Sequence, residues 1–304
     1  MGFIMKLARY VKDEQYRLAV NVDRGLYRFA TDEKFLRAKF KAKIGRDLDL
    51  NNPKTYNEKL QWLKLHDRKQ QYTTMVDKYE VKRYVSEIIG NEYIIPTFGV
   101  WERFDDIDFN LLPNQFVIKC THDSGGLCIV KDKNKFDIDK ARKKINKSLK
   151  RNYYSVSREW PYKNVKPRII VEQYMEDEID HPLRDYKIYT FNGNAKICMI
   201  NQDRKIHTRA DYFNEKYEWL DFIWGYDHAD KRPEKPLNYG LMFELAEKLA
   251  KGTATLRVDF YEVRGKLYFG ELTFYDGGGF DIIDPIEWDY KLGNMVTLPN
   301  SNEE

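Results

Sequence analysis

The chain has 304 residues, 42% hydrophobic and 33% charged, a balance that excludes a disordered chain and indicates a soluble globular protein. A net charge of +4, from 52 basic and 48 acidic residues, lacks the basic excess of a nucleic-acid-binding domain, so no nucleic-acid partner is expected. Three cysteines without a CxxC pair exclude a disulfide scaffold and a structural zinc site, so we expect a reducing compartment, the cytoplasm.

The first 50 residues are predicted to be helical and basic. Phe3, Leu7 and Val11 recur at helical spacing, with Lys6 and Arg9 between them. Two interpretations stay open: a helix packed on the rest of the protein, or a helix lying on a membrane surface. No run approaches the ~18 apolar residues of a transmembrane helix, so any membrane contact is expected to be peripheral.

Two more helices are predicted after a break at Asn51–Pro53. The first extends from Thr55 to Arg68. The second covers about 77–89, where Gly90 ends it, as glycine commonly does at a helix C-terminus. The apolar, β-branched segment 93–101 is predicted to form a short strand.

Beyond this point the hydrophobic period becomes that of strands. Phe116–Cys120 and Leu127–Val130 are predicted to pair as a hairpin, because Thr121–Gly126 between them is a loop of small residues. A basic helix is expected over 134–151, and a third strand over Arg168–Met175.

A second hairpin and another helix are expected next. Asp185–Phe191 turns at Asn192-Gly193 into Ala195–Ile200, and Asn-Gly is the strongest short hairpin signal. The helix covers about 239–251. Since helices and hairpins are mixed along the chain, the sequence predicts an α+β fold with mainly antiparallel sheets.

The last hairpin carries the clearest chemical pattern. Thr255–Glu262 turns near Gly265 into Leu267–Phe274, which places Asp259 and Glu271 opposite each other. Two carboxylates on adjacent strands repel unless a cation lies between them, and Mg²⁺ takes such oxygen ligands. The alternative is that both are ordinary solvent-facing strand charges.

A lysine beside a small-residue loop is a candidate phosphate site. Lys119 ends an apolar strand, and the backbone N–H groups of the following loop, which contains Ser124, Gly125 and Gly126, can surround phosphate oxygens. The plainer alternative is that Lys119 lies at a strand edge and discourages aggregation.

Glu172 and Lys187 are further candidates within strands. Glu172 follows the run Ile169–Val171, where a carboxylate can accept the amino proton of adenine. Lys187 lies in an aromatic-rich strand and can hold a phosphate. For each residue a purely structural role in the strand stays open.

Six of these segments occur in a fixed order, and that order is informative. They are Thr74–Tyr79, Phe116–Lys119, Ile170–Tyr174, Asp185–Lys187, Arg257–Asp259 and Gly270–Phe274. Together they resemble the motifs of the ATP-grasp superfamily. Asn57–Leu65 and Phe269–Phe274 resemble the ATP-grasp family linked to teichuronopeptide and capsule biosynthesis, and the resemblance covers roughly residues 50–295.

The resemblance implies an ATP site between two lobes. The lysines would contact phosphates, the loop before Leu127 would be a mobile lid, and Glu172 would mark the adenine hinge. Glu178 and Asp180 are candidates for the ribose contact. The residues implied to bind ATP are Lys78, Lys119, Ser124, Gly125, Gly126, Glu172, Gln173, Met175 and Lys187.

The resemblance also implies a catalytic metal site. Asp259 and Glu271 would bind Mg²⁺, while Arg257 and Lys187 would act on the phosphate being transferred. Many ATP-grasp enzymes have Asn two residues after the metal-binding Glu, whereas this chain has Thr273, whose hydroxyl can still bind Mg²⁺.

Three regions follow from this assignment. Residues 1–112 are expected to be mainly helical, 113–175 to form the small lobe with its lid, and 176–304 to form the C-terminal lobe with the metal site.

The implied activity is that of a carboxylate–amine ligase acting through an acyl phosphate. The link to capsule biosynthesis suggests a sugar acid of a surface polysaccharide as the carboxylate and an amino acid as the amine. The alternatives are a glycosyltransferase of capsule biosynthesis, an ATP-dependent sugar kinase, and a non-catalytic binding protein.

Overall fold

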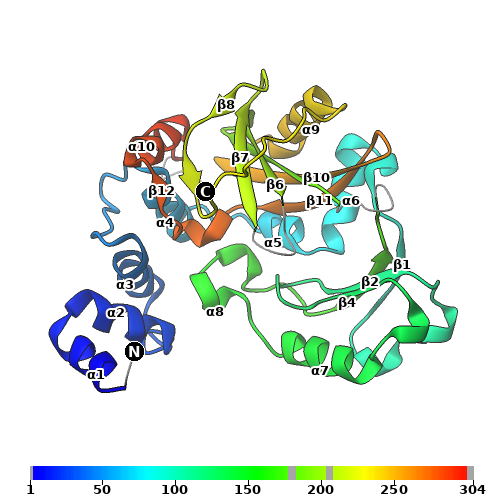
Figure 1. The fold of residues 1–304 in the computed structure, drawn as a ribbon, viewed down its shortest axis with the longest axis horizontal. Helices are drawn as coiled ribbons and strands as arrows, with labels where there is room; N and C mark the ends of the chain where they lie inside the picture. The colour runs from blue at the N-terminus through cyan, green and yellow to red at the C-terminus, as the bar shows by residue number, and fades with distance from the viewer. Residues whose placement is uncertain (1–2, 177–182, 203–207, 300–304) are drawn as a thin grey trace.

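Helices lie at both ends of the chain and cover its sheets in the computed structural model, which describes residues 3–176, 183–202 and 208–299 (Figure 1). They are α1 (Phe3–Lys12), α2 (Glu14–Asp23), α3 (Asp32–Ile44), α4 (Tyr56–His66), α5 (Gln71–Val76), α6 (Glu80–Ile89), α7 (Ile138–Leu149), α8 (Tyr154–Ser157), α9 (Tyr239–Ala250) and α10 (Ile286–Met295). Every helix that the sequence predicted is present, whereas α5, α8 and α10 were not predicted.

The strands of the described residues pair in antiparallel fashion throughout. They are β1 (Thr97–Trp101), β2 (Phe116–Cys120), β3 (Leu127–Val130), β4 (Ile169–Gln173), β5 (Asp185–Phe191), β6 (Asn194–Gln202), β7 (Arg209–Asn214), β8 (Trp219–Leu220), β9 (Ile223–Trp224), β10 (Thr255–Val263), β11 (Lys266–Thr273) and β12 (Ile283–Asp284). The predicted α+β class with antiparallel sheets is confirmed, whereas β7, β8, β9 and β12 were not predicted.

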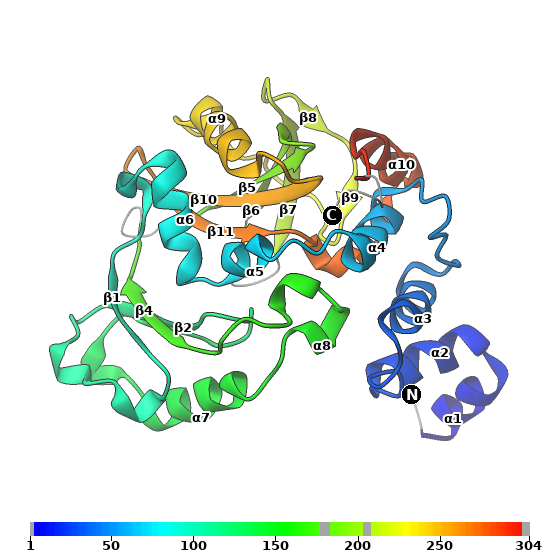
Figure 2. The ribbon, with the colours of Figure 1, turned by 180° about the vertical axis from the view of Figure 1, so that it is seen from behind.

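The larger sheet, here named the central sheet, has the strand order β11-β10-β5-β6-β7-β8. Its middle strand β5 is buried at every position, because α9 covers one face and other parts of the chain cover the second (Figure 2). The predicted turn between β5 and β6 has positive φ at both Asn192 (49°) and Gly193 (79°), as a two-residue hairpin turn requires.

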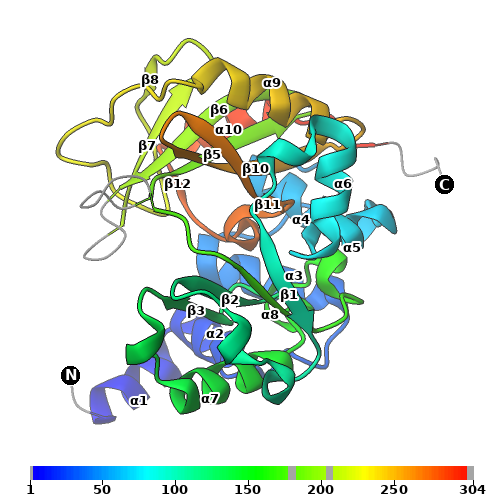
Figure 3. The same ribbon diagram turned by 90° about the vertical axis from the view of Figure 1, so that its right-hand side faces the viewer.

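The smaller sheet, here named the small sheet, has the order β1-β4-β2-β3 and faces the central sheet (Figure 3). Buried and half-buried side chains alternate along strand β2, and Phe116, Ile118 and Cys120 are buried against α7. The first strand of the small sheet, β1, begins at Thr97, whereas the sequence placed the start of the small lobe at residue 113. The division of the chain into three regions stays a prediction.

The N-terminal helices are joined to this body at α4 and at α8, where Lys39 Nζ donates to the Val156 carbonyl at 2.6 Å. Thr55 Oγ1 accepts the N–H of Glu58, and the Glu58 carboxylate accepts the N–H of Thr55, a capping box of the kind that stabilises a helix by about 1 kcal/mol. Asn57 then donates its N–H to Asp289 Oδ1 at 3.0 Å, which ties α4 to α10. No helix in the described ranges has both the length and the apolar composition needed to cross a membrane.

Candidate active site

The hairpin of β10 and β11 forms the centre of the site. Asp259 pairs in register with Glu271, and Arg257 pairs with Thr273, as the alternation along the strands predicted. A register shift follows between Asp259 and Phe260. The four polar side chains therefore form two cross-strand pairs that lie two residues apart on the same hairpin.

Arg257 is the cation that lies among the carboxylates. Its Nε and Nη2 donate to Asp259 Oδ1 and Oδ2 at 2.7 and 2.8 Å, and Nη2 also donates to Glu271 Oε1 at 2.9 Å. Its Nη1 pairs with Asp276, which accepts another hydrogen bond from Tyr189. These charge-assisted bonds relieve the repulsion between the opposed carboxylates.

Lys187 joins the same group from β5. Strand β5 pairs with β10, so Lys187 lies beside Asp259, and its Nζ donates to Asp259 Oδ2 at 2.5 Å and to Asp185 Oδ2 at 2.8 Å. Burial and Arg257 lower the pKa of Lys187, but the surrounding carboxylates outweigh them and raise it. We name the following residues the central cluster: Asp185, Lys187, Arg257, Asp259, Glu271 and Asp276.

The two opposed carboxylates differ in their exposure. Asp259 is 2% exposed, and its burial raises its pKa despite the neighbouring Arg257 and Lys187. The Glu271 side chain is 39% exposed, and its Oε2 lies 3.9 Å from Lys78 Nζ. Although burial opposes ionisation, Lys78 and the other cations lower the pKa of Glu271 to about 2. Glu271 is therefore an ionised carboxylate that a bound cation can reach.

A second charged group lies on the small sheet. Glu172 on β4 is 4% exposed, and its carboxylate receives Lys82 Nζ at 2.5 Å and Lys119 Nζ at 2.6 Å. Burial favours the protonated acid, but the two lysines outweigh it and lower the pKa of Glu172. Burial also lowers the pKa of Lys82, whereas Glu172 offsets burial at Lys119 and raises its pKa. We name these three residues the small-sheet cluster.

The loop after β2 closes over the space between the two sheets. Lys78 Nζ donates to the carbonyl oxygen of Asp123 at 2.7 Å, and Ser124 Oγ bonds to Tyr153 Oη at 3.3 Å. The Gly126 N–H donates to Asp123 Oδ1 at 3.0 Å. A Cβ on Gly126 would lie 2.5 Å from Cys120 Sγ, so only glycine fits this position.

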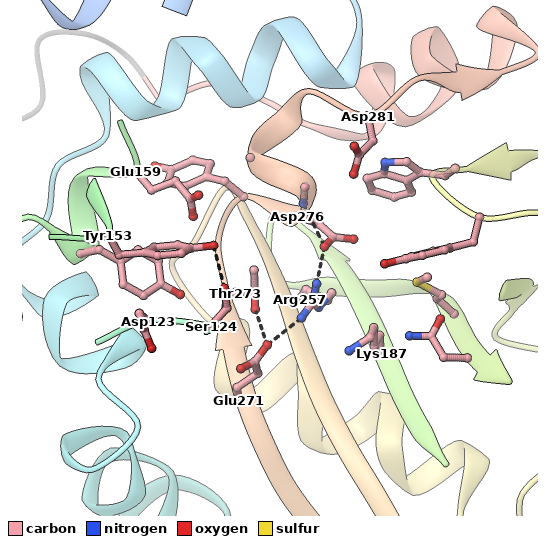
Figure 4. Close-up of a pocket in the computed structure, with 18 of the residues that line it drawn as sticks. Asp123, Ser124, Tyr153, Glu159, Lys187, Arg257, Glu271, Thr273, Asp276 and Asp281 are labelled. Atoms are coloured by element: carbon pink, nitrogen blue, oxygen red, sulfur yellow. Dashed lines mark hydrogen bonds and ion pairs between the residues drawn. The ribbon is translucent and has the colours of Figure 1, made fainter. Parts of the chain in front are cut away.

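A cavity of about 430 Å³ lies between this loop and the central sheet (Figure 4). In Figure 4, Tyr153 and Glu159 lie on the left, Asp276 and Asp281 at the top, and Arg257 and Lys187 below these two aspartates. Its walls are formed by Lys78, Asp123, Ser124, Tyr153, Glu159, Tyr162, Lys187, Met199, Asn201, Trp224, Tyr226, Arg257, Glu271, Thr273, Tyr275, Asp276, Gly277, Gly278 and Asp281.

Only some of the site residues predicted from the sequence line the cavity. The predicted residues in its walls are Lys78, Ser124, Lys187, Arg257, Glu271 and Thr273, and those outside its walls are Lys119, Gly125, Gly126, Glu172, Gln173, Met175 and Asp259. The carboxylate of Glu172 is held by lysines and the Gln173 N–H donates to the Pro96 carbonyl at 3.0 Å. The adenine hinge thus stays a prediction, and Glu178 and Asp180 lie outside the described residues.

Several residues of the site were missed by reasoning from the sequence. Asp185, a member of the central cluster outside the cavity walls, carried an available signal, because it lies two residues before Lys187 and so shares its strand face. Asp276 lies two residues after the motif Gly270–Phe274, and the glycines after it mark a turn. Glu159 and Asn201 carried no local signal, because their position in the cavity depends on how distant segments pack.

Of the three predicted Mg²⁺ ligands, Glu271 and Thr273 offer oxygen atoms in the cavity wall, with Thr273 Oγ1 3.4 Å from Glu271 Oε1. The third, Asp259, lies outside the wall, and both of its carboxylate oxygens already accept from Arg257 and Lys187. Mg²⁺ commonly takes one or two carboxylates and completes its shell with water and substrate phosphates. The described ranges hold no group of three or more acidic, His or Cys side chains placed to bind a metal, so phosphate oxygens would have to supply ligands.

The sequence matches a family model. The model describes TupA-like ATP-grasp proteins and matches residues 58–297, which is most of the chain. No curated protein matches the sequence.

Solved structures of low sequence identity also match. D-alanine–D-alanine ligase from Helicobacter pylori is 15% identical over 80% of this chain and 69% of its own length, with a TM-score of 0.42. N5-carboxyaminoimidazole synthetase from Staphylococcus aureus, complexed with ADP, is 14% identical over 82% of this chain and 61% of its own length, with a TM-score of 0.44. The chain spans 54–69% of the first matched structures, so the assignment depends on the family model.

Proposed function

The chain belongs to the TupA-like ATP-grasp family, a family of ligases, and we propose that it joins a carboxylate to an amine with ATP and Mg²⁺. The observation that carries this proposal is the cavity in which Lys78, Lys187 and Arg257 meet the ionised Glu271. Phosphoryl transfer chiefly requires cations placed where charge develops, and no protein nucleophile. The cavity walls offer this arrangement.

In the proposed first step, a substrate carboxylate oxygen attacks the γ-phosphorus of ATP. The bond from that phosphorus to the β–γ bridging oxygen breaks, which gives an acyl phosphate and ADP. The amine nitrogen then attacks the acyl carbon, the bond between that carbon and the phosphate oxygen breaks, and the amine loses a proton. The products are an amide, ADP and phosphate.

The side chains of the cavity have separate roles in this reaction. Lys78, whose Nζ also holds the loop at Asp123, would bind a transferred phosphate at the loop. Arg257 is fixed by three carboxylates, so it can neutralise developing charge without first being reoriented. Mg²⁺, held by Glu271 with Thr273, would supply charge neutralisation at the ATP phosphates, and Asp259 could join them only if Arg257 or Lys187 released one of its oxygens.

Family kinship supports a narrower substrate proposal. We propose that the carboxylate is a sugar acid of a surface polysaccharide and that the amine is an amino acid. We also propose a cytoplasmic location, in line with three free cysteines.

The N-terminal helix supports peripheral contact with an anionic membrane as a further part of this proposal. Helix α1 exposes Met5, Leu7 and Val11 and has no acidic residue in its first turn. Co-sedimentation with phosphatidylserine vesicles would test this contact, and a chain that stays in the supernatant at low salt would exclude it.

Titration of ATP, with and without Mg²⁺, into wild-type protein and Glu271→Gln tests the activity. We expect the variant to bind Mg-ATP about tenfold more weakly, ~1.4 kcal/mol, and to lose much of the Mg²⁺ dependence. Glu244→Gln, which removes an exposed carboxylate on α9, serves as the matched control and should bind as the wild type does.

Product analysis completes the test. Wild-type protein given Mg-ATP, a hexuronic acid and a panel of amino acids should release ADP and phosphate in equal amounts, and hydroxylamine should trap the acyl phosphate as a hydroxamate. ADP without free phosphate would instead identify a kinase. Folded protein that binds no ATP would overturn the proposal and favour a glycosyltransferase.

A further inference from the structure

Glu159 is a buried carboxylate in the cavity wall that has no cation as partner. The residue is 4% exposed, and its Oε1 accepts a hydrogen bond from Ser157 Oγ at 2.5 Å. Among the residues that the structure describes, no other group donates to this carboxylate and no basic side chain forms an ion pair with it. A buried carboxylate is costly without a cation, so one that lines a cavity indicates a cation that arrives with a ligand.

Lys64 is the lysine whose charge acts most strongly on Glu159, but it cannot be that partner. Its Nζ donates to Gln61 Oε1 at 2.9 Å and to the carbonyl oxygens of Ser157 and Gly278 at 3.0 and 2.5 Å. An ammonium group has three protons, so none is left for Glu159. Burial also lowers the pKa of Lys64 to about 7, so this lysine is charged only part of the time at neutral pH.

Two tyrosine rings complete the surroundings of the Glu159 side chain. The Tyr162 N–H donates to the Glu159 carbonyl at 3.1 Å and closes a turn of 3-10 helix, in which side chains three residues apart lie on the same side. Tyr153 lines the same part of the cavity, with its ring centroid 4.9 Å from that of Tyr162 (Figure 4). Because the faces of tyrosine rings attract ammonium groups, the rings and the carboxylate favour a ligand of the same charge.

The surroundings of Glu159 adjoin the part of the cavity that is proposed to transfer phosphate. Tyr153 Oη accepts from Ser124 Oγ of the loop after β2. After burial, the charges of Glu159 and Glu271 are the next contributions that raise the pKa of Tyr162, so its hydroxyl lies near both carboxylates. A group bound at Glu159 is therefore close to the site where the acyl phosphate would form.

The charges in the cavity walls favour an ammonium group over a hydroxyl or an anion. Lys187 and Arg257 already bond to carboxylates of the central cluster. Asp276 lies near enough for its charge to add to the effect of burial on the pKa of Glu159. A hydroxyl would donate to Glu159 but leave this negative charge uncompensated, whereas an ammonium group both donates and compensates it.

We propose that Glu159 binds the amine substrate in its ammonium form and accepts one of its protons before the amide forms. This proposal rests on the proposed function and adds the residue that selects and activates the amine. Burial raises the pKa of Glu159, which makes it a stronger base than an exposed carboxylate.

The proton transfer completes the second step of the reaction. One proton passes from the ammonium nitrogen to Glu159, and the free electron pair of that nitrogen attacks the acyl carbon. The bond between this carbon and the phosphate oxygen breaks, and the second proton of the nitrogen leaves with the phosphate. Glu159 then returns its proton to water, so one turnover leaves the residue as it began.

The first test compares binding of butylammonium and of 1-butanol to protein saturated with Mg-ADP, by ligand-observed nuclear magnetic resonance at neutral pH. The two probes differ in the charged group but hardly in size. Wild-type protein should bind butylammonium about tenfold more tightly than butanol. Glu159→Gln should remove this preference, and its carbonyl oxygen can still accept from Ser157, so the variant should fold.

Asp67→Asn is the matched control, because Asp67 is also buried, accepts a hydroxyl bond from Tyr72 at 2.9 Å and lies outside the cavity walls. It should keep the preference for butylammonium. Equal binding of the two probes by wild-type protein would overturn the proposal whether or not Glu159→Gln folds. Weaker binding of Mg²⁺ alone to Glu159→Gln would assign this carboxylate to the metal and also overturn it.

A second test separates the proposal from the proposed function. Hydroxylamine is largely neutral at neutral pH and needs no base, so Glu159→Gln should lower the ratio of amide to hydroxamate about tenfold, which a general loss of structure would not do. Hydroxamate formed with an unchanged ratio would keep the ligase activity and remove the role of Glu159. Butylammonium that binds through Glu159 in a protein that forms neither ADP nor hydroxamate would remove the ligase activity and leave an ammonium site.

Discussion

The central cluster and the small-sheet cluster both combine buried carboxylates with cations on strands, but their charge balance is opposite. In the central cluster, Lys187 and Arg257 lie among four carboxylates. In the small-sheet cluster, one carboxylate, Glu172, lies between Lys82 and Lys119. Excess negative charge favours binding of a cation, and excess positive charge favours binding of an anion.

This difference assigns complementary roles to the two sheets. The central cluster is suited to Mg²⁺, since Glu271 keeps an ionised oxygen at the cavity. The small-sheet cluster is suited to the phosphates that accompany it. Lys78 links the central cluster to the loop after β2, because its Nζ lies 3.9 Å from Glu271 Oε2 and donates to the Asp123 carbonyl.

Removal of Arg257 is the strongest way to break the central cluster. Arg257→Ala leaves Asp259 buried with only Lys187 as partner, and we expect a loss of about 3–5 kcal/mol in unfolding free energy. Denaturant unfolding monitored by circular dichroism measures it. Arg257→Lys, which keeps the charge but not the paired geometry, should lose less, and wild-type stability in Arg257→Ala would contradict this account.

Lys119→Met tests whether the small-sheet cluster serves phosphate. Glu172 keeps Lys82 as partner, so the variant should fold, while ATP affinity should fall about tenfold, ~1.4 kcal/mol. The loss should be similar with and without Mg²⁺, in contrast to Glu271→Gln. Lys166→Met, which removes an exposed lysine paired with Glu102, is the control. If Lys119→Met lowered affinity for Mg-ATP but not for ATP alone, Lys119 would act through the metal site, and the two clusters would not have separate roles.

The smallest effect concerns the pH dependence of stability. Because the pKa of Glu271 is lowered from 4.5 to about 2, its ionised form stabilises the folded state above pH 4.5. That contribution should disappear as the pH falls from about 4.5 to about 2. Unfolding free energies of wild-type protein and Glu271→Gln across this range should converge at the acid end, and a constant difference would refute the assignment.

The amino-acid sequence by itself determined the local elements and one pair of facing residues. Alternating apolar positions with a turn near Gly265 predicted that Asp259 faces Glu271, and this pairing is present. It depends on a bulge, because the register next to the turn, with Phe260 opposite Phe269, would by itself place Asp259 opposite Gly270. The turn at Asn192-Gly193 was also predictable from the local sequence, because a two-residue hairpin turn favours residues that adopt positive φ. The ordered motifs also gave the correct family.

Only the tertiary structure decided which of these elements meet. Strand β5 pairs with β10 across 72 positions of sequence, and that pairing alone brings Lys187 to Asp259. The lysines on Glu172, and the place of Glu159 and Asn201 in the cavity, likewise depend on packing between distant segments. Local periodicity predicts on which face of a strand or helix a side chain lies. Which other element packs against that face depends on how the whole hydrophobic core is buried.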